Sequence, residues 1–331
     1  MRIGIVGLGS VGKRHVRCIR QLGYEDIIAL RTKKGKTKTL PVEFNYIKEV
    51  FDVKDFYSNN LDGVIISNPT SLHIETIKIP LEKKIPIFLE KPIADSLEQL
   101  REIEDYDVTS VVVGFCWRYN EIINIVKGFI ASGKLGRIYK TNLYRGQFLP
   151  SWHPYADYRK EYYARKDLGG GVIRTLSHEI DLMHYFFGDP KELCASVEKI
   201  SDLEIDVDDN VYMICKMANH SVVSIELDYL NPVLTIRGII FGSEGTVEYS
   251  FSKLNVTFTD YNGKIRIIYE NANLDWNKMY IDQMKNFVNF IKNKESLCCT
   301  FEDGVNVMKV IKAAEESTKL KSWQGIGGAE V

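Results

Sequence analysis

The chain has 331 residues, of which 45% are hydrophobic and 26% charged, and its formal net charge is -1. This length favours two domains with a sizeable core, and the balanced charge excludes a general attraction to nucleic acid or to an anionic membrane. No stretch reaches the roughly 20 apolar residues that cross a bilayer, the apolar start is too short for a signal peptide, and six cysteines without a CxxC pair suit reduced thiols, so we expect a cytoplasmic protein.

Short apolar runs alternate with helix-forming segments through the first third of the chain, which is typical of a parallel sheet covered by helices. We expect helices after Gly9, from Pro69-Thr70 and after Pro92, the last capped by Asp95 or Ser96. The expected strands are residues 2–6, 26–31, 63–67, 85–89 and 110–114.

The pattern changes after about Trp117. Closely spaced β runs with turn residues between them predict an antiparallel or mixed sheet. The expected helices are 121–132, 171–187, 279–292 and 303–318, and the expected strands include 138–147, 211–217, 222–227, 235–241, 246–249, 254–258 and 265–269. We predict an α/β plus α+β chain, with a parallel-sheet domain at 1–118 and a domain at 119–331 that contains a large open sheet.

A glycine-rich loop, Gly7-Leu8-Gly9-Ser10-Val11-Gly12, follows the first expected strand directly and leads into a helix-forming stretch. Glycines there permit a tight turn and close backbone approach, and amides at a helix N-terminus attract the pyrophosphate of a dinucleotide. We therefore expect cofactor contacts from Gly7, Gly9, Ser10, Val11 and Gly12. The alternative is a strand-to-helix turn that binds nothing.

The second expected strand ends about twenty residues later, where an acidic side chain normally binds the ribose hydroxyls of NAD. This chain has Arg31, Thr32, Lys33 and Lys34 there instead. A guanidinium, a hydroxyl and ammonium groups suit a 2′-phosphate. Arg31, Thr32 and Lys33 therefore favour NADP over NAD as the cofactor, with an exposed basic loop as the alternative.

The tripeptide Glu90-Lys91-Pro92, after the fifth expected strand, is one of several motifs that occur together in a known family. The others are Ser67-Asn68-Pro69-Thr70 with His73, the segment 114–120, and Gly169-Gly170-Gly171 with His178 and Asp181. The order and spacing of these motifs are those of the glucose-fructose oxidoreductase and inositol dehydrogenase family, which the chain resembles over essentially its whole length. Through the segments 148–155, 157–160 and 164–167, the chain is most similar to a branch that looks like the bacterial dehydrogenases of nonulosonic-acid and surface-polysaccharide pathways.

The resemblance implies a Rossmann domain for dinucleotide binding at 1–118 and a substrate-binding and oligomerisation domain with an open-faced sheet at 119–331. It also implies that Lys91 lies beside the nicotinamide and the substrate hydroxyl as a catalytic group, although a solvated lysine is the alternative. The cofactor contacts that it implies outside the glycine loop are Asn68, Pro69, Thr70, His73, Glu90, Lys91 and Arg118.

His178 is the second catalytic candidate. On a continuous helix over 171–187, apolar residues at steps of three and four form one stripe, and His178 falls on the opposite, polar face. An imidazole with its usual pKa of about 6.5 suits exchange of a hydroxyl proton. Many members of the family carry an aspartate three or four residues earlier, whereas this chain has Thr175, so either Lys91 and His178 share the proton transfer or Thr175 only positions the substrate.

Residues 137–174 contain eight Lys or Arg against three Asp or Glu, with aromatic residues between them. This local excess indicates an anionic substrate, such as a nucleotide sugar or a sugar acid, with rings packed against its apolar faces. A solvated loop is the alternative, and nothing else in the chain supports nucleic-acid binding. The expected substrate contacts are Trp152, His153, Tyr155, Arg159, Arg165 and Thr175.

Together these features predict an NAD(P)-dependent sugar dehydrogenase or ketoreductase of surface-polysaccharide synthesis. A cyclitol dehydrogenase and a non-catalytic NADP-binding regulator are the alternatives. Scattered histidines predict no metal site. An open sheet face needs covering, so we expect a homodimer or homotetramer.

Overall fold

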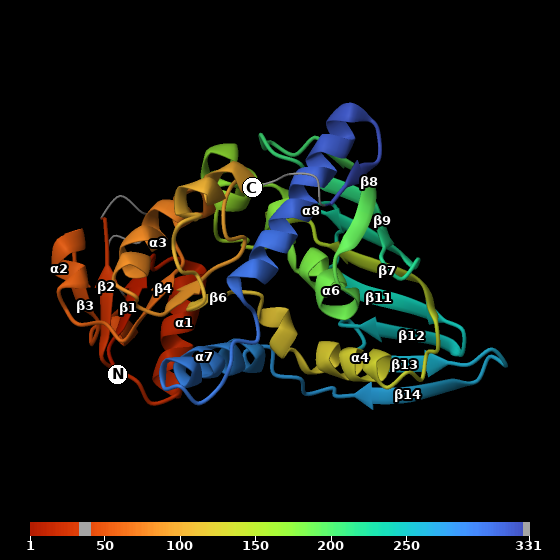
Figure 1. Cartoon of the computed structure of the whole chain (residues 1–331), viewed down its shortest axis with the longest axis horizontal. Coiled ribbons are helices and arrows are strands. Elements are labelled where there is room, and N and C mark those ends of the chain that lie inside the picture. Colours follow the sequence, from red (N-terminus) through yellow and green to blue (C-terminus); the bar gives the residue numbers. More distant parts are fainter. Residues whose placement is uncertain (33–40, 327–331) are drawn as a thin grey trace. The chain divides into compact units, whose positions relative to one another are not determined.

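Six strands form a parallel sheet within the part of the chain that the computed structural model describes, residues 1–32 and 41–326 (Figure 1). The strand order is β3-β2-β1-β4-β5-β6, and every neighbouring pair runs parallel. Five strands confirm the expected ones, and β3 is additional. The strands are β1 (Ile3–Val6), β2 (Ile27–Leu30), β3 (Lys48–Val50), β4 (Gly63–Ile66), β5 (Ile87–Leu89) and β6 (Val111–Val113).

The sheet is buried because helices cover it and its strands are almost continuously apolar. Ile5, Ile65 and Phe88, from three neighbouring strands, lie in one buried cluster with Val16 of α1 and Phe287 of α7. The helices of this part are α1 (Ser10–Gln21), α2 (Val53–Tyr57), α3 (His73–Glu82) and α7 (Lys278–Ile291). Short 3-10 helices span Val42–Phe44, Thr70–Leu72, Leu97–Ile103 and Cys116–Tyr119, and the third of these replaces the α-helix expected after Pro92.

The chain divides into two units. Unit 1 comprises Met1–Tyr119 and Trp276–Val305, and unit 2 comprises Asn120–Asp275 and Asn306–Val331. The first crossing lies one residue beyond the expected boundary at 118. A single boundary does not describe the division, however, because α7 packs its apolar side chains into the core of unit 1.

Unit 2 is built on a nine-stranded mixed sheet of order β14-β13-β12-β11-β7-β10-β9-β8-β15. The pair β7 and β10 is parallel, and the other neighbours are antiparallel. Strands β8 and β15 were not expected. The strands are β7 (Ile138–Gly146), β8 (Pro190–Glu198), β9 (Asn210–Met217), β10 (Val222–Asp228), β11 (Thr235–Gly242), β12 (Gly245–Ser250), β13 (Asn255–Thr259), β14 (Ile265–Glu270) and β15 (Gln324–Gly325).

Helices pack against one face of this sheet (Figure 1). Strand β9 shows the resulting alternation: Val211, Met213 and Cys215 are buried, whereas Tyr212 and Ile214 are exposed on the other face. The helices are α4 (Glu121–Ala131), α5 (Val172–Thr175), α6 (His178–Phe187) and α8 (Phe301–Leu320), whose first residues belong to unit 1. Short 3-10 helices span Leu149–Ser151, Tyr158–Lys160, Tyr162–Ala164 and Lys166–Leu168.

The parallel sheet of unit 1 and the mixed sheet of unit 2 confirm the predicted fold class. The continuous helix expected over 171–187 is wrong in one respect. It is interrupted at Leu176, whose backbone leaves the helical conformation (φ -97°, ψ 25°), and a new helix begins at His178.

Candidate functional site

The glycine loop meets the spatial requirements of a dinucleotide site. Gly7 has φ +94°, and a Cβ there would lie 2.5 Å from the backbone nitrogen of Asn68. A Cβ on Gly12 would lie 2.1 Å from the carbonyl oxygen of Gly7. Gly9 differs, because a Cβ on it would meet no atom within 4 Å. The first and third glycines therefore permit tight packing, while Gly9 leaves open space for close approach of a pyrophosphate.

Helix α1 begins at this open space. Gly9 precedes it in an extended conformation, no side chain caps it, and its first turn contains no acidic residue. Ser10 is exposed and Val11 half-buried. The first amides of the helix and the positive end of its dipole are thus suited to an anion. Ser67 supports the turn from the neighbouring strand, since its hydroxyl donates to the carbonyl of Gly7 at 2.7 Å.

Arg31 follows β2 and is bound within the protein. Its side chain is 6% exposed, and its Nη1 donates to Oε2 of Glu49 on β3 at 2.5 Å. Thr32 is exposed. Lys33 and Lys34, which the sequence also assigned to the 2′-phosphate, lie outside the described residues. The guanidinium expected to bind a phosphate therefore already shares its charge with a carboxylate.

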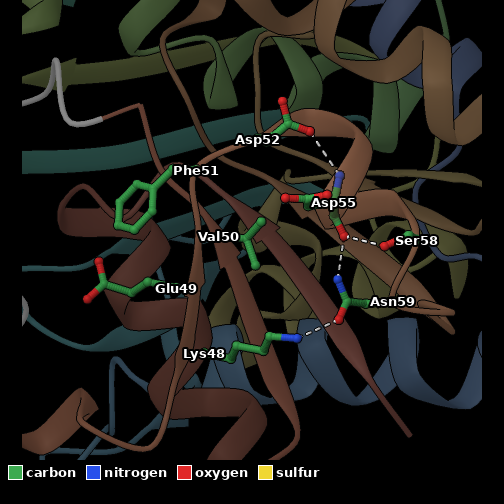
Figure 2. A pocket seen from close by; sticks show the side chains of 8 residues that line it. All are labelled: Lys48, Glu49, Val50, Phe51, Asp52, Asp55, Ser58 and Asn59. Atoms are coloured by element: carbon green, nitrogen blue, oxygen red, sulfur yellow. Dashed lines mark hydrogen bonds between the residues drawn. The ribbon is translucent and has the colours of Figure 1, made fainter.

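Glu49 also lines a surface pocket of about 570 Å³ (Figure 2). The other acidic residues that line it are Asp52 and Asp55 at the start of α2. Among its described lining residues the one ammonium group belongs to Lys48, whose Nζ donates to Oδ1 of Asn59 at 2.8 Å. The pocket lies beside the edge strand β3 and carries an excess of negative charge.

The Glu90-Lys91-Pro92 turn follows β5 and is held from inside the unit. Oε1 of Glu90 lies 2.6 Å from Nε2 of His15, which is fully buried on α1, and Oε2 of Glu90 accepts from the backbone N–H of Lys91 at 3.2 Å. The Lys91–Pro92 peptide bond is cis. A Cβ on Gly114 would lie 3.1 Å from this carboxylate. Sequence reasoning missed His15, although its place on the buried face of α1, one turn after Gly12, was a usable signal.

His73 braces two loops of unit 1. Its ring is buried, with Nδ1 2.9 Å from the carbonyl oxygen of Pro92 and Nε2 3.0 Å from that of Asn68. Burial lowers the pKa of His73, and the hydrogen bonds to these carbonyls partly oppose that shift. A direct cofactor contact was expected here. The ring is 1% exposed and both nitrogens face carbonyls, so it joins the loops that carry Asn68 and Pro92.

Arg118 is also internal to unit 1. Its Nη2 lies 3.1 Å from Oδ1 of Asp303, and its Nη1 donates to the carbonyl of Cys298 at 3.2 Å. The side chain is 4% exposed. Arg118 was expected to contact the cofactor, but these bonds attach its 3-10 helix to the end of unit 1 and use the guanidinium for structure. Among the remaining expected contacts, Pro69 is half-buried and Thr70 is buried.

His178 is the first residue of α6 and is buried, as are Thr175 at the end of α5 and Asp181. The sequence placed His178 on the polar face of a continuous helix, and its burial excludes a fully solvated side chain at that position. The break at Leu176 changes the angular relation between the two helical segments, so a single helical wheel does not apply. Lys91 belongs to unit 1 and His178 to unit 2.

The three glycines before α5 have a structural purpose. Gly169 and Gly171 have φ of +79° and +112°, and a Cβ on Gly170 would lie 2.4 Å from the carbonyl oxygen of Tyr162. Asp208 caps the N-terminus of α5, since its Oδ2 accepts from the backbone N–H of Ile173 at 2.9 Å. This tight turn positions α5 and therefore Thr175.

Aromatic side chains of the segment 137–174 pack against one another and form hydrogen bonds within the protein. Trp152 packs against Tyr163 and Tyr229 at centroid distances of 5.1 and 5.3 Å, and its Nε1 donates to the carbonyl of Gln147. His153 lies 3.1 Å from the hydroxyl of Tyr155, which is 86% exposed.

Several cations of this segment pair with acids, and some of those acids lie later in the sequence. Arg159 is bound by Asp157 at 2.8 Å and by Glu204 at 2.5 Å. Arg165 is bound by Asp167 at 2.5 Å, and Arg174 by Glu315 at 2.6 Å. The hydrogen bond from Arg159 lowers the pKa of Asp157. The positive excess counted along 137–174 is therefore partly offset in the folded chain.

Two kinds of feature are absent from residues 1–32 and 41–326, the described part of the chain. No helix there is long and apolar enough to span a membrane. No group of three or more His, Cys, Asp or Glu side chains there is arranged to hold a metal ion.

Comparisons with known proteins match both units. Residues 1–112 match the family profile described as oxidoreductase family, NAD-binding Rossmann fold, and residues 123–248 match that of the GFO/IDH/MocA C-terminal domain. The chain is 23% identical to myo-inositol 2-dehydrogenase of Thermotoga maritima over 97% of both chains. It is 25% identical to glucose-6-phosphate 3-dehydrogenase of Bacillus subtilis over 68% of this chain and 66% of that protein.

A solved structure of levoglucosan dehydrogenase in complex with NADH and levoglucosan has the same fold, with a TM-score of 0.86 at 20% identity over 99% of both chains. The two profile matches together span more than two thirds of the chain and fall on its two sheets in the expected order. The glycine loop and the Glu90-Lys91-Pro92 turn lie within the first match. The chain therefore belongs to the GFO/IDH/MocA family of NAD-binding oxidoreductases.

Proposed function

We propose that this protein is a dehydrogenase that transfers a hydride between a nicotinamide and a CH–OH or keto carbon of a sugar or cyclitol. The glycine loop carries the proposal, because Gly9 opens onto space at the N-terminus of a helix without an acidic first turn. Bound NAD would supply the hydride acceptor, and the residues of the chain would hold the cofactor and exchange the hydroxyl proton. In this proposal unit 1 binds the dinucleotide and unit 2 the substrate.

Lys91 and His178 are the proposed catalytic residues. As an ammonium ion, the lysine side chain polarises a carbonyl oxygen, and as a neutral amine it accepts a hydroxyl proton. A neutral imidazole also accepts a hydroxyl proton. The bond from Glu90 to the backbone of Lys91 supports this assignment, because it fixes where the lysine side chain begins. Thr175 has no carboxylate, so its proposed part is to orient the substrate by hydrogen bonding.

NAD is the proposed working cofactor. The sequence favoured NADP because Arg31 stands where an acid usually meets the ribose hydroxyls. The ion pair between Arg31 and Glu49 supports NAD instead, since it offsets the cation and brings a carboxylate to the same end of the sheet.

A neutral polyol is the proposed substrate class. The pairing of Arg159, Arg165 and Arg174 with acids supports it, because a guanidinium already bound to a carboxylate attracts a second anion weakly. The relative named as a myo-inositol 2-dehydrogenase supports it as well, because inositol is an uncharged ring with several hydroxyl groups.

An anionic sugar is the second candidate. The excess of eight basic over three acidic residues along 137–174 favours it, as does the relative named for a sugar phosphate. A nucleotide sugar or a sugar acid of surface-polysaccharide synthesis belongs to this candidate.

A cytoplasmic location is part of both proposals, because the cysteine spacings are not those of a disulfide framework.

Self-association through the exposed face of the unit 2 sheet is a further part of the proposal. Tyr212, Ile214 and Val222 are 56%, 48% and 37% exposed on this face. Apolar side chains grouped on an open sheet are typical of a protein–protein contact, and a second copy of the chain would cover them in a homodimer or homotetramer.

A binding and turnover screen tests this function. The full chain with NAD is offered myo-inositol, neutral hexoses, hexose phosphates, sugar acids and nucleotide sugars, and formation of reduced nicotinamide is followed. We expect turnover with at least one neutral polyol and weaker turnover with its phosphorylated form. NAD binding without turnover on any compound would contradict the enzyme and favour a cofactor-binding regulator, and preference for the anions would favour the second candidate.

A further inference from the structure

Two charged residues, Arg31 and Glu49, lie at the C-terminal ends of β2 and β3. These strands are parallel neighbours, with Ala29 opposite Glu49 and Leu30 opposite Val50. The backbone N–H of Arg31 donates to the carbonyl of Val50 at 2.9 Å, which continues the pairing one residue past β2. Arg31 and Glu49 therefore stand side by side at the edge of the sheet where the adenine ribose of a dinucleotide normally binds.

The two side chains meet there in a charge-assisted hydrogen bond. Nη1 of Arg31 and Oε2 of Glu49 are 2.5 Å apart, the guanidinium side chain is 6% exposed, and the carboxylate side chain is 33% exposed. A buried guanidinium bound in this way has one face committed, while the carboxylate stays accessible to solvent.

The surroundings of Glu49 add negative charge. Glu49, Asp52 and Asp55 all line the pocket in Figure 2, and among its described lining residues Lys48 carries the one ammonium group. A 2′-phosphate carries about two negative charges, as phosphate esters do near neutral pH. It would meet carboxylates as well as the shared guanidinium, whereas a 2′-hydroxyl is a donor that a carboxylate oxygen accepts.

We infer that Glu49 determines the cofactor preference of this protein by holding Arg31 in an ion pair that admits the ribose hydroxyl of NAD and disfavours the 2′-phosphate of NADP. The inference rests on the proposed cofactor role of unit 1. It assigns to β3 the acidic residue that Rossmann folds usually place at the end of the second strand.

The test is a set of equilibrium binding titrations with NAD and NADP on the full chain. Wild-type protein binds NAD more tightly than NADP. Glu49→Gln, which keeps the size of the side chain, tightens NADP binding by about tenfold, the size of effect that removing one close charge produces. Its Kd for NAD rises a few-fold, because an amide oxygen accepts the ribose hydroxyl more weakly than a carboxylate does, and a melting temperature near that of wild type shows that the variant is folded.

Two further variants separate this mechanism from a general charge effect. Asp55→Asn removes the same charge from the same pocket without touching Arg31, and it shifts the NAD to NADP ratio clearly less than Glu49→Gln does. In an Arg31→Ala background, Glu49→Gln no longer improves NADP binding, because the gain depends on releasing the guanidinium.

An unchanged ratio in Glu49→Gln, an equal shift in Asp55→Asn, or a gain that persists without Arg31 would each overturn the inference while wild-type NAD binding leaves the proposed function standing. Wild-type protein that binds neither dinucleotide would instead overturn the proposed function itself.

Discussion

His15, Glu90 and Lys91 form a chain of contacts from the cofactor helix to the proposed catalytic lysine. The imidazole of His15 is fully buried and 2.6 Å from Glu90, whose other oxygen accepts from the backbone of Lys91. A buried carboxylate is stable only when its oxygens find donors. At the scale of single residues, the position of Lys91 therefore depends on a histidine that touches neither cofactor nor substrate.

Replacing His15 measures what this contact contributes to stability. His15→Phe leaves the Glu90 carboxylate without its imidazole partner, and we expect the free energy of unfolding to fall by about 2–3 kcal/mol in a urea titration. His15→Gln, which keeps a donor, loses about half as much. The half-exposed pair of His184 and Asp189 is the control, since His184→Gln costs less than about 1 kcal/mol there. Equal losses at His15 and His184 would show that burial of the first pair adds nothing.

His73 gives the stability of the protein a pH dependence. Burial lowers the pKa of His73 below its usual value of about 6.5, so below that pH the unfolded chain binds a proton that the folded chain resists. Stability is therefore lost as pH falls from about 6.5 toward the pKa of the folded state. Unfolding titrations at about pH 7.5 and about pH 5.5 should show a smaller difference for His73→Gln than for wild type. The same difference in both proteins would contradict the assignment.

The sequence predicted some of these residues and not others, for physical reasons. Gly7, Gly9 and Gly12 are recognisable because a local turn demands them at fixed spacing. His15 and Glu49 act through partners 75 and 18 residues away, and although the place of His15 on α1 was a local signal, no local pattern identifies the partner of either residue. Arg31 was identified correctly as the residue after β2, but its charge partner on β3 was not, so the expectation of NADP rested on the cation alone.

At the scale of elements, the strand–loop–helix unit formed by β1, the glycine loop and α1 carries the dinucleotide proposal. Its glycines fall into two classes, those whose side of the backbone is occupied and one, Gly9, whose side is open. Gly7 and Gly12 are therefore needed for packing of the loop, whereas Gly9 is needed for approach of the cofactor.

A methyl group on Gly9 should therefore affect binding alone. Gly9→Ala meets no protein atom within 4 Å, so its melting temperature stays near that of wild type, while its Kd for NAD rises by about tenfold or more because the methyl occupies the approach path. Gly128→Ala, in the exposed middle of α4 with equally open space, raises stability by about 0.5–1 kcal/mol and leaves the Kd unchanged. Unaltered NAD binding by Gly9→Ala would argue against the loop as the cofactor site.

Element prediction succeeded where hydrophobic pattern and turn chemistry agree. The five apolar strands of unit 1 and helices α4, α7 and α8 were all expected. Strand β3 was missed because it has three residues, Lys-Glu-Val, of which only Val50 is buried. The break between α5 and α6 was missed because Leu176 and Ser177 are compatible with a helix, and the tertiary contacts of the sheet override that preference.

At the scale of the whole molecule, the chain crosses between its two units more than once. Helix α7, far along the sequence, belongs to unit 1 because Met284, Phe287 and Val288 complete its core. Sequence composition does not change at this return, so a single boundary was the natural expectation. The exposed apolar residues of β9 and β10 concern the molecule as an assembly.

Charge on that face should disrupt self-association. Ile214→Glu places a carboxylate in the centre of the proposed contact, and light scattering after size exclusion should show a smaller species than wild type at the same concentration. Val42→Glu, at an 82% exposed position in unit 1, leaves the assembly unchanged. A wild-type protein that is already monomeric, or an Ile214→Glu variant that keeps the wild-type size, would contradict a contact through this face.

We propose above all that Lys91 takes part in hydride transfer to a dinucleotide bound by unit 1. The most direct measurement is single-turnover hydride transfer with saturating NAD and the best substrate of the screen, together with the Kd for NAD. We expect Lys91→Ala to slow hydride transfer by about 10²–10⁴-fold, as loss of a positioned proton-transfer group does, with a Kd for NAD near that of wild type and no effect of Lys83→Ala at an exposed site. Wild-type rates of hydride transfer in Lys91→Ala, with NAD binding intact, would contradict the account.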